Sequence, residues 1–106
     1  MPNHKRHPLS ERFHEILAGL GDLHDLKQKD YGVDDDPFRN VRNSADFGVS
    51  PWVGCMIRAN DKMKRIQAFA QKGELANESV LDSLDDLAVY AVIARVLLEE
   101  ELADAN

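Results

Sequence analysis

Three acidic side chains recur at one-turn intervals in the C-terminal third of the chain. Glu78, Asp82 and Asp86 are spaced i, i+4 and i+8, which places them along one face of a helix. Like charges at this spacing repel by roughly 0.2–0.5 kcal/mol on an exposed helix and by more when buried. A counter-charge is therefore expected. It is either a hard divalent cation, Mg²⁺ or Mn²⁺, or the basic side chains of a neighbouring helix.

Basic side chains that could balance these acids lie in the preceding segment. Arg58, Asp61 and Arg65 fall at i, i+3 and i+7, and Lys62 lies on the next row. A helix here would present these residues together. Two interpretations stay open: the basic residues pair with the acids and set the register of two packed helices, or both groups bind a charged ligand.

A third group of polar residues ends an apolar pattern nearer the N-terminus. His24 and Lys27 continue the stripe formed by residues 13, 17 and 20, and Asp30 and Tyr31 follow. In one interpretation, Lys27, Asp30 and Tyr31 lie at the mouth of the same site. In the other, His24 is a hydrogen-bonded histidine that is buried or at the boundary of the core, and Lys27 buries its stem while its ammonium reaches water.

Three helices are expected to position these residues. Apolar side chains recur at helical spacing over residues 10–30, 51–72 and 78–103. Because no segment alternates with a period of two for long enough to be a strand, the expected fold class is all-α, with three principal helices in a small bundle. The second helix has the clearest start, with Pro51 at its first position, where the missing N–H costs nothing. The expected N-caps are Ser10, Ser50 and Asn77.

A long loop is expected between the first two helices. Residues 33–48 are rich in Asp, Asn and Ser, and they include Pro37, which disfavours helix at the residue before it. A loop of this length in a small domain is typical of a lid or binding loop. The alternative is a packed Ω-loop that carries Phe38 and Phe47 into the core.

The third helix is apolar over a wider arc than one small bundle can cover. A helix of this kind is usually buried on several sides. We therefore expect another subunit to cover it, in a homodimer or homotetramer. The apolar side chains that point in nearly every direction are Val89, Tyr90, Val92, Ile93, Val96 and Leu97.

Length, charge and cysteine content exclude several classes of protein. The 106 residues correspond to one domain, expected over residues 1–106 with residues 1–9 as a flexible arm. Thirteen basic and nineteen acidic residues give a net charge of −6, which argues against direct nucleic-acid binding. No apolar run is long enough to span a membrane, and no apolar stretch follows the basic N-terminus as in a signal peptide. A cytoplasmic location is therefore expected.

Two further features have structural interpretations. Cys55 is the single cysteine, which excludes an intramolecular disulfide framework and a Cys-rich zinc site. It is expected to be a small core residue, because nothing nearby suggests a catalytic base. The acidic run 99–101 is expected to be a frayed, solvated helix end.

Three blocks of sequence resemble a known family when taken in order. They are residues 27–32 (Lys-Gln-Lys-Asp-Tyr-Gly), residues 58–65 (Arg-Ala-Asn-Asp-Lys-Met-Lys-Arg) and residues 78–91, which end in Asp-Leu-Ala-Val-Tyr-Ala. Over roughly residues 10–98 the chain resembles the small helical phage and actinobacterial proteins known as MazG-like nucleotide pyrophosphohydrolases, or nucleotide-modification-associated domains. Their all-α relatives carry a Glu-rich metal motif on the earlier helix, where this chain has Asp61 alone.

The resemblance implies an Mg²⁺- or Mn²⁺-dependent hydrolase. It would convert a nucleoside triphosphate or deoxynucleoside triphosphate to the monophosphate and pyrophosphate, in phage or prophage nucleotide metabolism and in the host cytoplasm if phage-encoded. Asp82 and Asp86 would be catalytic. The implied metal ligands are Glu78, Asp82, Asp86 and Asp61. The implied substrate-binding residues are Lys27, Asp30, Tyr31, Asn40, Arg58, Lys62 and Arg65.

Two non-catalytic alternatives stay open. In the first, the chain binds a nucleotide without hydrolysing it. In the second, it is a protein-binding module whose acidic surface suits a basic partner. In either case the rows of Asp and Arg side chains would be interhelical salt bridges.

Overall fold

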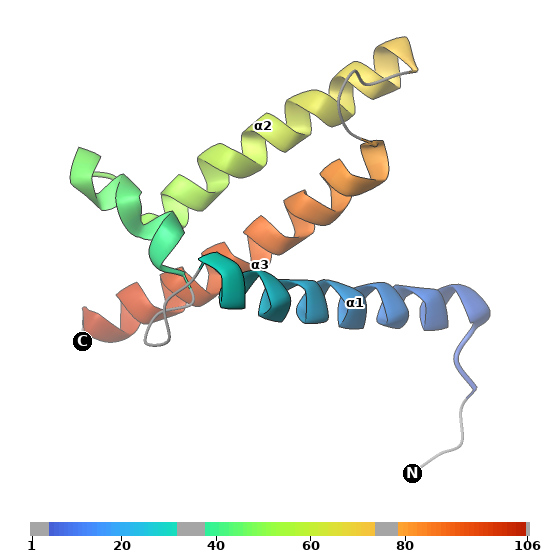
Figure 1. Ribbon diagram of the computed structural model, residues 1–106, viewed down its shortest axis with the longest axis horizontal. Coiled ribbons are helices and arrows are strands. Elements are labelled where there is room, and N and C mark those ends of the chain that lie inside the picture. Colours follow the sequence, from blue (N-terminus) through green and yellow to red (C-terminus); the bar gives the residue numbers. More distant parts are fainter. Residues whose placement is uncertain (1–4, 32–37, 74–78, 106) are drawn as a thin grey trace.

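The computed structural model describes the backbone of residues 5–31, 38–73 and 79–105 (Figure 1). The side chains of residues 27–31, 39 and 40 lie outside this description. Four helices follow one another along the chain, and the described residues contain no strand. The expected all-α fold class is therefore confirmed. The helices are α1 (Pro8–Tyr31), the 3₁₀ helix η1 (Arg39–Phe47), α2 (Pro51–Lys72) and α3 (Val80–Asp104).

Helices α2 and α3 run antiparallel and form the main packed unit (Figure 1). The buried positions are Cys55 and Ala59 on α2, and Ser83, Ala94 and Leu97 on α3. All of them except Leu97 are small. Because the distance between two packed helices depends on the side chains at their contact, these positions favour a close approach of the two backbones.

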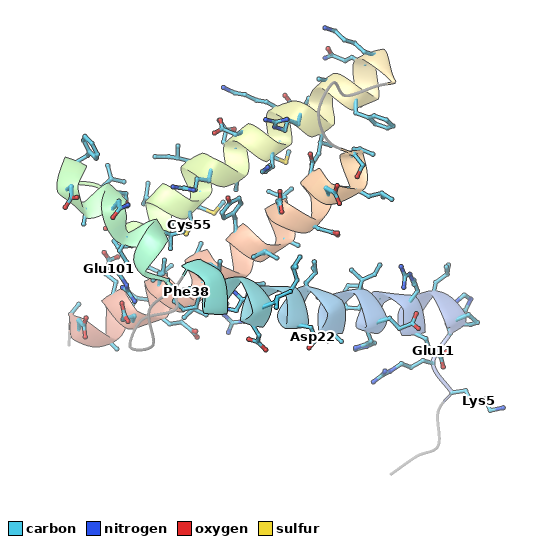
Figure 2. The ribbon with its side chains drawn as sticks, in the orientation of Figure 1. Lys5, Glu11, Asp22, Phe38, Cys55 and Glu101 are labelled. Carbon is cyan, nitrogen blue, oxygen red and sulfur yellow. The ribbon has the colours of Figure 1, made fainter. Side chains whose placement is uncertain are left out.

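Helix η1 closes one end of the α2–α3 pair. Its buried Val41 joins Cys55, Ala94 and Leu97 in a hydrophobic core cluster, and Figure 2 shows Cys55 on the part of α2 nearest to η1 and α3. The side chains that pack against this cluster while partly exposed are Phe38, Trp52 and Ile93.

A glycine allows η1 to approach α2 closely. A Cβ atom built on Gly54 would lie 2.5 Å from Ser44 Oγ and 2.7 Å from Ser44 Cβ, well inside the normal contact distance. The Ser44 hydroxyl donates a hydrogen bond of 3.3 Å to the Ser50 carbonyl oxygen. Any side chain at position 54 would therefore displace Ser44 and disturb the start of α2.

Helix α1 stands largely apart from the other helices. Its C-terminal half reaches α3, whereas its N-terminal half extends away from the molecule (Figure 1). Large apolar side chains on the extending half are consequently exposed, including Leu9 at 76% and Phe13 at 59% of their maximal surface. This apolar face has no cover within the described part of the chain.

The expected helix ends are confirmed for α2 and are wrong at two other places. Helix α1 begins at Pro8, so Pro8 and Leu9 belong to the helix rather than to the expected arm, and Ser10 is not its cap. Instead, Leu9 N–H donates to His7 Nδ1 at 3.1 Å. Helix α3 begins at Val80, and its cap is Ser79, whose hydroxyl oxygen accepts from Asp82 N–H at 3.0 Å. The expected cap, Asn77, lies outside the described residues.

The segment expected as a loop contains η1, which the local pattern of turn-forming residues did not predict. Phe38 packs against the core cluster, as the Ω-loop interpretation expects. Phe47 does not, because it is 85% exposed.

No helix in the described ranges is both long and apolar enough to cross a membrane.

Candidate functional site

An ion pair at the α2–α3 interface joins two of the predicted site residues. Lys62 Nζ on α2 lies 2.9 Å from Asp86 Oδ2 on α3. Both side chains are partly withdrawn from water, with 17% of Lys62 and 33% of Asp86 exposed. A charge-assisted hydrogen bond of this length is stronger than a neutral one. The sequence-based interpretation of an acid–base pair between these helices is therefore correct for Lys62 and Asp86.

Asp82 lies one turn before Asp86, at the start of α3. Its backbone N–H is bound by the Ser79 hydroxyl, and its side chain is exposed. A carboxylate in the first turn interacts favourably with the partial positive charge of a helix N-terminus. Asp82 therefore stabilises the start of α3, whether or not it also binds a ligand.

The remaining predicted residues of α2 lie around Lys62. Arg58 is one turn before it and Arg65 one turn after it, and both are exposed, as is Asp61. Lys62 and Asp86 form the contact between the two helices, and Arg58 and Arg65 on α2 and Asp82 on α3 lie within one turn of them along their own helices. We call this group the α2–α3 charged seam, defined by Arg58, Lys62, Arg65, Asp82 and Asp86.

Five predicted site residues cannot be placed against this seam. Glu78 lies outside the described residues. The backbones of the other four lie in α1 and η1, while their side chains are among those not described. Those four are Lys27, Asp30, Tyr31 and Asn40.

The described side chains provide a small set of metal-binding oxygens. Among the described residues, no group of three or more His, Cys, Asp or Glu side chains is placed to hold a metal ion. Asp82 and Asp86 are adjacent on one face of α3. Mg²⁺ in nucleotide-binding sites is often held by one or two carboxylates together with water and substrate phosphates. The described side chains therefore form no closed cage, and a cation at this place would bind through these two carboxylates together with water or ligand oxygens.

A second feature is an apolar groove between α1 and α3. It has a volume of about 370 Å³, and its walls include Leu17 and Leu20 of α1 and Val92 and Val96 of α3. His24 is the one residue with a polar side chain that lines it within the described part of the chain. The expectation that His24 is a boundary residue is correct, because it is half-buried.

The wall of this groove is completed by an aromatic contact. The His24 ring stacks on the Phe38 ring with their centroids 5.5 Å apart and their planes inclined by 26°, so Phe38 connects α1 to the core cluster. A groove with such an apolar lining offers few hydrogen-bonding groups for a nucleotide. Among the described side chains, the groups that could bind a charged ligand therefore lie at the charged seam rather than in this groove.

The acidic end of α3 is held by polar contacts that local sequence patterns did not predict. Arg42 binds Glu100 through two nitrogen–oxygen contacts, of 2.7 and 3.3 Å. Glu101 accepts hydrogen bonds from the Ser50 hydroxyl at 2.6 Å and from Trp52 Nε1 at 3.1 Å, where Figure 2 shows it near η1. The expectation of a frayed end is therefore wrong, because the helix continues to Asp104, whereas the expectation that residues 99–101 are exposed to solvent is confirmed.

The same contacts change the role of Ser50. It is the N-cap residue of α2 as predicted, but its side chain makes no capping hydrogen bond and binds Glu101 instead. Cys55 is fully buried, as predicted, and burial raises the pKa of its thiol while the nearby Arg58 guanidinium acts in the opposite direction. A protonated, inaccessible thiol is a poor nucleophile.

Comparison with known proteins adds no assignment to this geometry. No protein family model, no curated protein and no solved structure matches the chain.

Proposed function

We propose that this protein is an Mg²⁺- or Mn²⁺-dependent nucleoside triphosphate pyrophosphohydrolase that uses the α2–α3 charged seam. The observation that carries the proposal is the partly buried pair of Lys62 and Asp86, with Asp82 one turn away on the same helix. One carboxylate and one ammonium meet at this interface, and a second carboxylate and two guanidinium groups within one helical turn of them would suit a hard cation and phosphate oxygens. The resemblance of the three sequence blocks to MazG-like proteins supports the same reaction.

In this proposal the Lys62–Asp86 ion pair positions both side chains before substrate binds. Asp86 and Asp82 would hold the cation through carboxylate oxygens, and Lys62 Nζ would turn from Asp86 to a phosphate oxygen of the nucleotide. Arg58 and Arg65 bind further phosphate oxygens from the exposed side of α2. When bound, the cation neutralises phosphate charge and makes water a stronger nucleophile at neutral pH.

The overall reaction is hydrolysis of the phosphoanhydride bond between the α- and β-phosphorus atoms of the triphosphate. Water attacks the α- or β-phosphorus, and pyrophosphate and the nucleoside monophosphate separate. Lys62 and the two arginines would stabilise the negative charge that develops on the phosphate oxygens. We place this activity in the cytoplasm, in the nucleotide metabolism of a phage or prophage host.

The first prediction concerns turnover by the Asp82→Asn variant. Purified protein is incubated with Mg²⁺ or Mn²⁺ and a panel of nucleoside and deoxynucleoside triphosphates, with pyrophosphate and orthophosphate measured separately. The wild type releases pyrophosphate only with metal. Asp82→Asn lowers the rate by roughly 100-fold or more, because one carboxylate that holds the cation is lost.

The control for this variant is Asp22→Asn, which removes one exposed carboxylate from α1 and should leave the rate unchanged. Circular dichroism should show the same helix content for all three proteins, because the Asp82 side chain is exposed and the Ser79 cap remains. Full activity of Asp82→Asn would contradict the metal assignment, and no pyrophosphate release from any nucleotide would contradict the proposed reaction.

A second candidate function is a non-catalytic binding module, which the direct contact between Lys62 and Asp86 favours. Metal-dependent pyrophosphate release by the wild type distinguishes the two candidates, and the double variant Lys62→Asp plus Asp86→Lys then tests what the pair does, because it exchanges the charges while keeping an ion pair. If the pair is only structural, the double variant recovers the stability that each single variant loses. Under the enzyme proposal it also stays inactive, because the cation-binding carboxylate has moved to the other helix.

A further inference from the structure

We propose that the apolar groove between α1 and α3 is covered by a second copy of this chain. The extending N-terminal half of each α1 would lie in the groove of its partner, in a two-fold symmetric dimer. This inference is independent of the proposed enzymatic activity.

The first support is the amount of surface that one copy exposes. The chain has an accessible surface of 8316 Å², whereas a compact monomer of this mass is expected to expose about 5,900 Å². The excess is about 2,400 Å² per chain. Obligate homodimers bury 2,000–5,000 Å² in total, or about 1,000–2,500 Å² per partner. One copy therefore exposes the additional surface that a permanent homodimer would bury.

The second support is the shape of one copy. Its Cα radius of gyration is 16.5 Å, while a compact domain of this length has a radius of about 13 Å. A compact body with twice the number of residues has a radius of about 17 Å. A single chain is thus as extended as a whole dimer, as expected when the helices of two copies pack across one another.

The third support is that the chain carries both a groove and an apolar helix face with no cover. The groove includes the α3 wall formed by Val92 and Val96, which are 60% and 40% exposed. The extending half of α1 presents Leu9, Phe13 and Ile16 on one stripe, with between 40% and 76% of each side chain exposed. Each copy has one groove and one extending helix. A two-fold axis therefore places the helix of each copy in the groove of the other, which leaves no groove or helix uncovered and closes the assembly as a dimer.

The chemistry of the groove favours this occupant over a small polar ligand. Its lining is apolar apart from His24, whose ring already stacks on Phe38. Small-molecule sites usually add several polar groups that fix the orientation of the ligand. An amphipathic helix needs only apolar side chains at helical spacing to lie in such a groove, and α1 supplies them.

The test is the mass of the full-length protein in solution, measured by sedimentation equilibrium at micromolar concentration. Twice the chain mass of 11.9 kDa, or 23.8 kDa, is expected. Phe13→Lys and Val92→Glu should each give an 11.9 kDa species with unchanged helix content, because both side chains are more than half exposed in one copy. The matched control is Ile57→Glu, at a position that is 56% exposed on α2, and it should remain a dimer.

A mixing experiment tests which surfaces meet. In a heterodimer of the Phe13→Lys and Val92→Glu chains, one contact joins Lys to Glu and the symmetric contact is that of the wild type. Equimolar mixing should therefore restore the dimer mass. A monomeric wild type, a dimer that survives both substitutions, dissociation only by Ile57→Glu, or a mixture that stays monomeric would each overturn the proposed pairing.

Discussion

Partial burial determines how the Lys62–Asp86 pair responds to substitution. A fully exposed ion pair contributes about 0.2–1 kcal/mol to stability, whereas removing one member of a buried pair leaves the other charge without compensation and costs more. Lys62 and Asp86 lie between these limits. Asp82 is exposed and so lacks the burial that causes this penalty. Asp82 is consequently the better position for testing catalysis, and Asp86 the better position for testing stability.

The buried thiol of Cys55 gives a prediction of pH dependence. Burial raises its pKa in the folded protein, while an unfolded cysteine loses its proton near pH 8.5. The folded state therefore retains a proton that the unfolded state releases. Its contribution to the free energy of unfolding is complete below about pH 8 and is lost as the pH rises through 8.5 toward the folded-state pKa.

Two measurements check this prediction. Labelling of Cys55 by a thiol reagent at pH 8 should be at least roughly tenfold slower in the native protein than in denaturant. Cys55→Ala should cost about 1–2 kcal/mol at pH 7 because of the cavity that it creates, and the difference from the wild type should shrink between pH 8.5 and 10. Rapid native labelling, or a difference independent of pH, would show that the thiol is not buried as described.

At the scale of the elements, α3 has two different apolar faces. One face buries Ala94 and Leu97 against its neighbours in the described structure, and another carries Val92 and Val96 into the groove. The N-terminal end of α3 holds the two aspartates of the charged seam, and the C-terminal end is fixed by Arg42, Ser50 and Trp52. One helix therefore contributes to the core, to the candidate site and to the proposed dimer.

The close approach of η1 and α2 gives a prediction at position 54. Gly54→Ala should lower the free energy of unfolding by about 1–3 kcal/mol, because the new Cβ would overlap Ser44. Gly19→Ala is the matched control. A Cβ at that position of α1 meets no atom within 4 Å, so the better helix propensity of alanine should raise stability by about 0.5–1 kcal/mol. Both values come from denaturant titration.

Repeating Gly54→Ala in a Ser44→Gly variant shows whether the overlap with Ser44 causes the loss of stability. Ser44→Gly removes the two Ser44 atoms that the new Cβ would overlap and leaves only the Val41 carbonyl oxygen, at 3.9 Å, among its near contacts. In that background Gly54→Ala should cost far less than in the wild type. An equal cost in both backgrounds would assign the effect to α2 itself rather than to its contact with η1.

The sequence predicted the elements better than their long-range contacts. Helical periodicity and the Ser50–Pro51 start are local signals, and they located α2 correctly. The Lys62–Asp86 pair was predictable because acids and bases recur at helical spacing on two expected helices. The pairing of Glu100 and Glu101 with η1 and the start of α2 joins residues far apart in the chain, and no local pattern reveals it. Phe47 shows the same limit, since composition does not tell which aromatic ring faces the core.

At the scale of the whole molecule, little apolar surface is fully enclosed by one copy. Apolar residues make up 43% of the chain, yet among the described residues only Val41, Cys55, Ala59, Ala94 and Leu97 are buried apolar positions. A core this small contributes little against the conformational entropy that folding removes. The sequence-based expectation of an oligomer started from the wide apolar arc of α3, and the exposed faces of α1 and α3 give that proposal a physical reason.

If dimerisation stabilises the folded chain in this way, stability depends on protein concentration. A partner that binds only the folded state stabilises it by mass action. With an unfolding enthalpy of roughly 150 kcal/mol for two chains of this length, a hundredfold increase in concentration should raise the Tm by about 5–8 °C, as measured by circular dichroism. Val92→Glu should have a lower Tm that does not change with concentration, while Ile57→Glu should keep the concentration dependence. A wild-type Tm independent of concentration would mean that one copy folds alone, so that the exposed faces of α1 and α3 contribute nothing to its stability.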